Sequence, residues 1–232
     1  LAELQNEDWS EAAILVKGSR NSRLERLCHR LERRCHTTVL EVDLRAMRSN
    51  LDYFRRCLPP HHPIMAMVKA GSYGAGDAEV AQMLQHEGAA YLAVAFADEG
   101  VVLREKGITM PIVVLNADED SFEQMIRFDL EPEIYSFRSL DAFSRAADRA
   151  GRKHYPIHIK LDTGMHRLGF VEEQIDPLAE RLAKMHNLKA ATIFSHLNCS
   201  DTPSEDEYTR RQIALYDAMS SRLCEQLPYR PI

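Results

Sequence analysis

The sequence predicts an α/β fold in which parallel strands alternate with helices. Apolar, strand-like runs and helix-like segments alternate from residue 39 to the end of the chain. Gly88, Gly107 and Gly151 each lie just past a predicted helix, where a C-terminal cap needs a positive φ. Three predicted strands end on a lysine or a histidine next to a turn. Parallel α/β barrels assemble their active sites at this end of their strands, so these strand ends predict a site as well as a fold.

The predicted strands are short runs rich in apolar residues, at 38–42, 64–68, 91–95, 112–115, 131–135, 157–161 and 190–194. The predicted helices lie between them, at 44–57, 77–87, 98–106, 119–128, 137–150, 172–186 and 205–226. In the first helix, the apolar residues recur at helical spacing: Leu44, Met47, Leu51 and Phe54.

Composition is typical of a soluble globular enzyme. The chain has 232 residues, of which 45% are hydrophobic and 28% charged, so it can bury a sizeable core. A net charge of -6 argues against nucleic-acid binding by the whole chain. The five cysteines have no C-x-x-C spacing, which indicates neither a disulfide framework nor a zinc site and favours a reducing, cytoplasmic compartment. No apolar run approaches the roughly 18 residues of a membrane span.

The N-terminal segment is the most basic part of the chain. Between residues 17 and 34 it carries seven Lys and Arg residues against Glu25 and Glu32. Because no aromatic residue is interleaved for stacking, a solvated helix face is favoured over a nucleic-acid or phosphate patch. The chain starts Leu-Ala-Glu-Leu, with neither an initiator Met nor a signal peptide, so we expect it to begin partway through a longer polypeptide.

Lys69 is the first candidate for chemistry. Residues 67–76 read M-V-K-A-G-S-Y-G-A-G, so the lysine stands where an apolar strand gives way to a glycine-rich turn. A lysine in that position loses water on one side, which favours the neutral amine that attacks a carbonyl carbon to form a Schiff base. The alternative is a lysine whose stem packs on the strand end while its ammonium group reaches solvent.

Two further segments repeat this pattern. Residues 157–170 read I-H-I-K-L-D-T-G-M-H-R-L-G-F, a strand that runs into a glycine turn carrying a cation. Residues 191–197 read A-T-I-F-S-H-L, a strand that ends on a histidine. Three such strand ends at the same edge of a parallel sheet indicate a common site.

These three segments resemble, in order, the motifs of the alanine racemase family of fold-type III pyridoxal phosphate enzymes. The matches are K-x-x-x-Y-G-x-G at 69–76, K-x-D-T-G-M-x-R-L-G at 160–169, and Ser195-His196. The resemblance covers residues 39–232. The chain departs from the usual motif residues at four turn positions, which are Gly71, Ser72, Ala75 and His166.

The resemblance implies a TIM-type (β/α)8 barrel that binds pyridoxal 5'-phosphate and interconverts L-alanine and D-alanine for peptidoglycan precursor synthesis. Lys69 would bind the cofactor and act as the base on one face of the substrate, and a tyrosine from the partner subunit of a homodimer would act on the other. Tyr73 would bind the cofactor phosphate, although a packed aromatic with a satisfied hydroxyl is the alternative. Arg167 would hold the phenolic oxygen and the substrate carboxylate. His196 would lie against the pyridine ring, whereas without the resemblance it reads as a strand-end core histidine.

Lys160 is expected to be buried in or against the barrel, because Ile159 and Leu161 flank it in a predicted strand. Burial beside Arg167 would disfavour its charged form. Carbamylation by CO₂, which occurs in some racemases of this family, would turn Lys160 into an anion that pairs with Arg167. A neutral lysine, or an ion pair with Asp162, is equally open.

The predicted barrel is incomplete. The resemblance places the strand at 38–42 outside the barrel, so six of eight barrel strands remain, and residues 228–232 stand where the seventh should begin. We therefore expect residues 38–232 to be a truncated racemase barrel without its last two strands and its C-terminal β-domain. Residues 1–37 resemble the tail of a Mur ligase, the one that adds D-alanyl-D-alanine to the muramoyl tripeptide. That likeness rests on A-I-L-V-K-G-S-R at 13–20 and R-L-E at 23–25, and it implies a fused ligase-racemase.

Two other functions share the predicted barrel. One is a single-domain pyridoxal phosphate-binding protein without strong catalysis, and the other is a decarboxylase of the same fold type. The long motif at 160–169 argues against both.

Overall fold

The computed structural model describes residues 39–232, of which residues 43–232 form one structural unit. The expected ligase tail at 1–37 and the basic segment at 17–34 lie outside the described residues.

Six parallel strands form one sheet in the order β1 to β6, so each strand pairs with the next one along the chain. The strands are β1 Met65–Met67, β2 Tyr91–Val94, β3 Ile112–Val114, β4 Glu131–Ile134, β5 Tyr155–Lys160 and β6 Leu188–Phe194. This is the strand order of a (β/α) barrel, and six strands make an incomplete one. The predicted fold class and the six barrel strands are confirmed. Ile232 exchanges backbone hydrogen bonds with Ala191 and Ile193 and so lies alongside β6.

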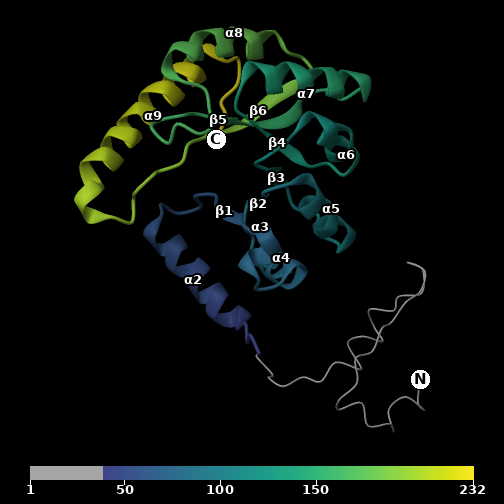
Figure 1. Cartoon of the computed structure of the whole chain (residues 1–232), viewed down its shortest axis with the longest axis vertical. Helices are drawn as coiled ribbons and strands as arrows, with labels where there is room; N and C mark the ends of the chain where they lie inside the picture. The colour runs from purple at the N-terminus through teal and green to yellow at the C-terminus, as the bar shows by residue number, and fades with distance from the viewer. Residues whose placement is uncertain (1–38) are drawn as a thin grey trace, which may run out of the picture. The chain divides into compact units, whose positions relative to one another are not determined.

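Most helices follow a strand and lie on the outer side of the sheet (Figure 1). The helices are α2 Leu44–Cys57, α3 Lys69–Tyr73, α4 Asp77–His86, α5 Ala97–Glu105, α6 Phe122–Arg127, α7 Phe137–Arg149, α8 Ile175–Lys184 and α9 Asp206–Gln226. Short 3-10 turns precede three of them, namely η3 Glu119–Ser121, η4 Glu172–Gln174 and η5 Pro203–Glu205. Every predicted helix is present, and the glycines at 88, 107 and 151 have positive φ as expected. No helix in the described part of the chain is both long and apolar enough to cross a bilayer.

The strand predicted at 38–42 is wrong for the residues that the structure describes. Residues 39–42 adopt no strand, and Val39 and Leu40 are exposed. A strand needs a partner for its backbone hydrogen bonds, and within the described range no strand pairs with this segment. The chain instead enters α2 through Asp43, whose carboxylate accepts the N–H of Arg45 at 2.8 Å and caps the helix.

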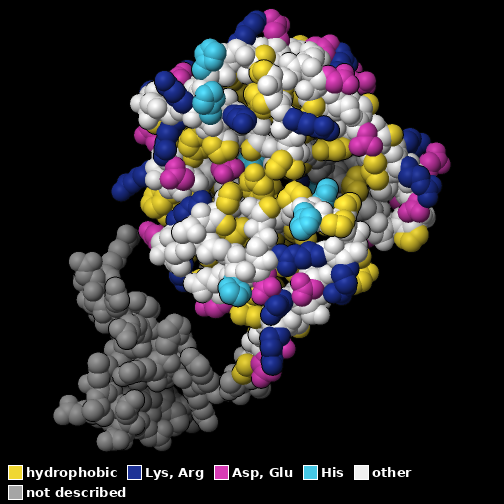
Figure 2. Space-filling view, turned by 180° about the vertical axis from the view of Figure 1, so that it is seen from behind, with side chains coloured by type: hydrophobic (Ala, Val, Ile, Leu, Met, Phe, Trp, Pro, Cys, Tyr) yellow, Lys and Arg dark blue, Asp and Glu magenta, His cyan; other side chains and the backbone are white. Residues whose placement is uncertain are grey.

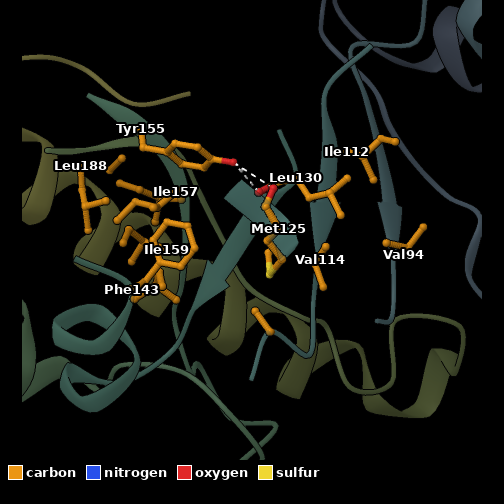
Figure 3. Close-up of a cluster of buried hydrophobic side chains, with 14 of the residues drawn as sticks. Val94, Ile112, Val114, Met125, Leu130, Phe143, Tyr155, Ile157, Ile159 and Leu188 are labelled. Carbon is orange, nitrogen blue, oxygen red and sulfur yellow. Dashed lines mark hydrogen bonds between the residues drawn. The ribbon is translucent and has the colours of Figure 1, made fainter. Parts of the chain in front are cut away.

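The outer face of the sheet forms the hydrophobic core beneath the helices (Figure 3). Successive side chains of a strand point to opposite faces, so one alternate set faces the helices. That set is fully buried and apolar: Leu92, Val94, Ile112, Val114, Ile134, Ile157 and Ile159. The ring of Phe143 from α7 packs edge-on against Tyr155 at 5.4 Å between centroids. The Tyr155 hydroxyl donates a hydrogen bond to the Leu130 carbonyl at 2.9 Å, so the one polar atom here is satisfied.

The inner face of the same sheet is polar on its last three strands. His158 is fully buried, with Nε2 at 2.8 Å from Glu131 Oε2 and Nδ1 at 2.7 Å from Thr192 Oγ1. Two residues further along their strands, Glu133 and Lys160 are buried as well. Barrel interiors are usually filled by branched apolar residues, so this polar interior calls for a chemical explanation. On the molecular surface of Figure 2, charged side chains occupy mainly the periphery and hydrophobic ones gather toward the middle.

Candidate active site

A cleft of about 470 Å³ opens where β1, β5 and β6 end. All five residues predicted from the three motif segments line it, namely Lys69, Tyr73, Lys160, Arg167 and His196. Its remaining walls are mainly apolar, with Met65 and Met67 from β1 and Phe194 from β6 among them. The structure thus brings together side chains that the sequence separates widely.

The turn after Lys69 is left-handed. Ala70, Ser72 and Tyr73 have φ of 51°, 53° and 58°, and Gly71 has φ of 60°. The left-handed conformation costs about 1–2 kcal/mol for each residue with a Cβ, so the surroundings must impose it. Hydrogen bonds within the turn contribute, from the Ser72 N–H to the Val68 carbonyl and from the Gly74 N–H to the Ala70 carbonyl, both at 3.0 Å. The sequence predicted a glycine-rich turn here but not its handedness.

Glu99 of α5 fixes this turn to the neighbouring strand. One carboxylate oxygen accepts the Ala70 N–H at 2.6 Å, and the other accepts the Ala95 N–H at 2.7 Å and the Phe96 N–H at 3.1 Å. The backbone next to Lys69 is therefore held by three charge-assisted hydrogen bonds through one side chain. Sequence reasoning missed Glu99, because its place in the first turn of a helix indicates only a local cap.

The second motif forms a closed loop that presents Arg167 to the cleft. The backbone groups of Lys160 and Asp162 bond to Phe170 at 2.9 Å, which brings the two ends of the loop together. Gly169 has φ of 135°, and a Cβ there would lie 2.5 Å from the Asp162 nitrogen, so only glycine fits.

The carboxylate of Asp162 bonds to groups of this loop and not to Lys160. Its Oδ1 accepts the N–H groups of Gly164 and His166, each at 3.0 Å, and its Oδ2 lies 3.3 Å from His166 Nδ1. Burial alone would raise the pKa of Asp162, but the bonds from His166 and Gly164 bring it below its ordinary value. No ion pair between Lys160 and Asp162 is present among the described residues.

His196 is held in place through its backbone. Gln212 of α9 is buried, and it donates to the His196 carbonyl at 3.1 Å and accepts the Asn198 N–H at 2.9 Å. The preceding Ser195 hydroxyl donates to the Leu161 carbonyl at 2.9 Å, which ties β6 to the second motif. Burial lowers the pKa of His196, and the charges of Lys160, Arg167 and Lys69 lower it further. Partial burial and the neighbouring cations therefore both favour the neutral imidazole.

Lys160 and Glu133 are the buried ionisable side chains of the cleft, with 8% and 4% of their surfaces exposed. The Lys160 ammonium lies 4.6 Å from the centroid of the Phe194 ring. Burial lowers the pKa of Lys160, and Arg167 adds to this while Glu133 opposes it. Burial raises the pKa of Glu133 to about 7, although Lys160 and Arg167 both oppose the rise. Sequence reasoning missed Glu133, although its two-residue spacing from Glu131 could have placed both on one face of the strand.

Comparison with known proteins assigns the family. Residues 42–232 match the model of the alanine racemase N-terminal domain. The chain belongs to this family. An alanine racemase of Methanococcus maripaludis is 35% identical over 183 residues, which is 78% of this chain and 48% of the relative. One of Synechocystis is 34% identical over 191 residues, or 82% of this chain and 51% of the relative. The chain thus spans about half the length of the curated family members it matches.

Solved family members have the same fold. An alanine racemase of Clostridium difficile 630 in complex with cycloserine superposes with a TM-score of 0.75 at 34% identity, covering 82% of this chain and 53% of that one. The enzyme of a D-cycloserine-producing Streptomyces lavendulae has a TM-score of 0.76 at 27% identity, with coverages of 84% and 52%. The six-stranded sheet of this chain therefore corresponds to part of a racemase barrel.

Proposed function

We propose that this chain is the pyridoxal phosphate-binding barrel of an alanine racemase, which interconverts L-alanine and D-alanine for peptidoglycan precursor synthesis. The observation that carries the proposal is the convergence of Lys69, Tyr73, Arg167 and His196 on one cleft. Membership of the alanine racemase N-terminal domain family supports this reading over a single-domain binding protein or a decarboxylase.

The residues of the cleft fit pyridoxal phosphate. Lys69, Lys160 and Arg167 all act electrostatically on His196, so three cations surround a space suited to a small ligand with a phosphate and a carboxylate. The amine of Lys69 is the group that can bind an aldehyde carbon covalently. When bound, the cofactor supplies a ring that stabilises negative charge at the substrate Cα.

Each of these residues then has a defined role. Lys69 would hold the cofactor through its carbonyl, and the free Lys69 amine would remove or return the Cα proton of the substrate on its own face. The Tyr73 hydroxyl, at the exposed mouth of the cleft, donates to the phosphate. The forked guanidinium of Arg167 holds the phenolic oxygen and the substrate carboxylate. His196, whose pKa is lowered by burial and by neighbouring cations, packs against the pyridine ring as a neutral group.

Borohydride trapping tests this assignment. Incubation of the chain with pyridoxal phosphate should produce a visible absorbance band, and borohydride should fix the cofactor on Lys69, as mapped by peptide mass spectrometry. The Lys69→Met variant should lose both signals, whereas Lys106→Met, which removes an exposed lysine, should keep them. Fixation on Lys160, or scattered over surface lysines, would refute the assignment.

We further propose that this chain alone lacks appreciable racemase activity and that the active protein is a homodimer. Racemisation needs an acid-base group on each face of the substrate, and by resemblance the second one is a tyrosine of the partner subunit. Among the described residues, Tyr73 is the only tyrosine that lines the cleft, and its proposed partner is the phosphate. Comparable conversion of L-alanine to D-alanine by this chain and by a full-length version would contradict this.

The wider context is also a proposal. The likeness of residues 13–25 to the end of a Mur ligase supports a cytoplasmic protein in which a ligase and a racemase are fused. The reading frame upstream of residue 1 tests this, because it should encode the rest of the ligase.

A further inference from the structure

Glu133 and Lys160 both line the cleft, from the adjacent strands β4 and β5. Glu133 of β4 is in register with His158 of β5, and Lys160 lies two residues further along, so both side chains point to the inner face. Both are more than nine-tenths buried, and the exposed Arg167 completes the group. This group therefore contains two cations and one anion, and Lys69 lines the same cleft as a third basic residue.

The other nearby carboxylates bond to groups other than Lys160. Glu131 bonds to His158 at 2.8 Å, and Asp162 bonds to His166 and to the backbone of its own loop. Within the described part of the chain, Glu133 makes no hydrogen bond or ion pair with another residue. Of the carboxylates near Lys160, Glu133 is the one whose charge raises the pKa of this lysine most. Burial of an ionised group is costly unless an opposite charge is near, and the charge of each of these two side chains opposes the effect of burial on the pKa of the other.

We propose that Glu133 is the resident counter-ion of Lys160 and keeps this lysine unmodified. Carbamylation first requires the lysine ammonium group to lose a proton; the neutral nitrogen then bonds to the carbon of CO₂ and releases a second proton. Two protons leave in all, and a cation is replaced by an anion. The product would add a second anion to this buried part of the wall, and Arg167 would be the one cation left in the group of Glu133, Lys160 and Arg167. With Glu133 present, its carboxylate already supplies the negative charge that a carbamate would otherwise bring.

This deepens the proposed function, because it sets the charge that the cleft offers to its ligand. An unmodified Lys160 leaves the group of Glu133, Lys160 and Arg167 with a net positive charge, which suits a phosphate or carboxylate. A carbamate beside an ionised Glu133 would make the group net negative and would repel such ligands.

A direct search for the carbamate is the first test. The full chain, with and without pyridoxal phosphate, is equilibrated with bicarbonate at a pH above 7, where Glu133 is ionised. Any carbamate is then trapped by O-alkylation and mapped by mass spectrometry. We expect no adduct on Lys160, while the α-amino group, with its pKa of about 8, serves as the positive control. An adduct on Lys160 would overturn the proposal, and this measurement needs no variant.

The reactivity of the Lys160 amine is the second test. Glu133→Gln removes the counter-ion, so the fraction of neutral amine should rise and Lys160 should be acylated about tenfold faster, which corresponds to one pKa unit. Asp162→Asn is the matched control and should change this rate less than twofold. An unchanged rate in Glu133→Gln, or an equal or larger response in Asp162→Asn, would refute Glu133 as the partner. Neither test requires racemase activity or the Lys69 adduct, so this proposal can fail independently of the proposed function.

Discussion

The two faces of the β-sheet differ in what their buried side chains do. In β5, Ile157 and Ile159 point outward beneath α7 and are fully buried without a polar atom. Their neighbours His158 and Lys160 point inward and are also buried, but each depends on partners from other strands. One strand of six residues therefore alternates between side chains that stabilise the fold and side chains that shape the cleft.

Within β5, the outward side chains therefore contribute to stability and the inward side chains to the chemistry of the cleft. Apolar burial is non-directional and contributes about 25 cal/mol per Å², so the outward face needs only the right volume. The inward face needs specific partners at specific distances, since a buried ionisable group without a partner is strongly unfavourable. Substitutions on the two faces should accordingly have effects of different kind as well as different size.

The largest effect on stability is expected from the outward face. Ile159→Ala should lower the free energy of unfolding by about 2–5 kcal/mol, because it removes buried methyl groups and leaves a cavity beneath α7. Urea denaturation measures this. Val102→Ala on the partly exposed face of α5 is the control and should change stability by less than about 0.5 kcal/mol. A small effect of Ile159→Ala would mean that the outward face is not the main source of stability.

The sequence predicts features that depend on a local pattern better than features that depend on partners elsewhere in the fold. That Lys69, Lys160, Arg167 and His196 line one cleft could be predicted from short local strings, because each lies at or shortly after the end of a strand whose pattern is visible in the sequence. Their grouping in one cleft then follows from the parallel sheet.

Residues that act across the fold could not be found in this way. Glu99 reaches the turn of Ala70, and Glu133 reaches Lys160, through pairings that no local spacing encodes. The left-handed turn was missed because non-glycine residues rarely adopt it without support from the surroundings. The strand at 38–42 was predicted from apolar residues alone, although a strand also requires a partner.

The buried ionisable side chains of the inward face should make the stability of the fold depend on pH. Burial raises the pKa of Glu133 from 4.5 to about 7, against the opposing charges of Lys160 and Arg167. A carboxyl group with a raised pKa stabilises the fold fully below its unfolded pKa, and this contribution is lost as pH rises through its folded pKa. The wild-type chain should therefore lose stability relative to Glu133→Gln between pH 4.5 and 7, by an amount on the order of 3 kcal/mol.

Denaturation curves of both proteins across that range measure the difference. Glu105→Gln, at an exposed position of α5, should leave the pH profile of the wild type unchanged. If the stability of Glu133→Gln and of the wild type changes with pH in parallel, Glu133 does not titrate as a buried group. The inward face would then contribute to stability in the same pH-independent way as the outward face.

The smallest effect concerns the strained turn beside Lys69, where the cleft imposes a backbone conformation that the chain does not favour. Ala70 has φ of 51°, so Ala70→Gly should relieve this strain and raise the free energy of unfolding by up to about 1 kcal/mol, while Glu99 still accepts its N–H. Ala183→Gly in α8 is the matched change at an exposed helical position and should lower stability by about 1 kcal/mol. In thermal or urea denaturation, the change from Ala to Gly should thus raise stability at Ala70 and lower it at Ala183. A loss of stability at both would contradict the left-handed turn. A gain at Ala70 alone would mean that the chain accepts strain at its cleft in order to position the lysine.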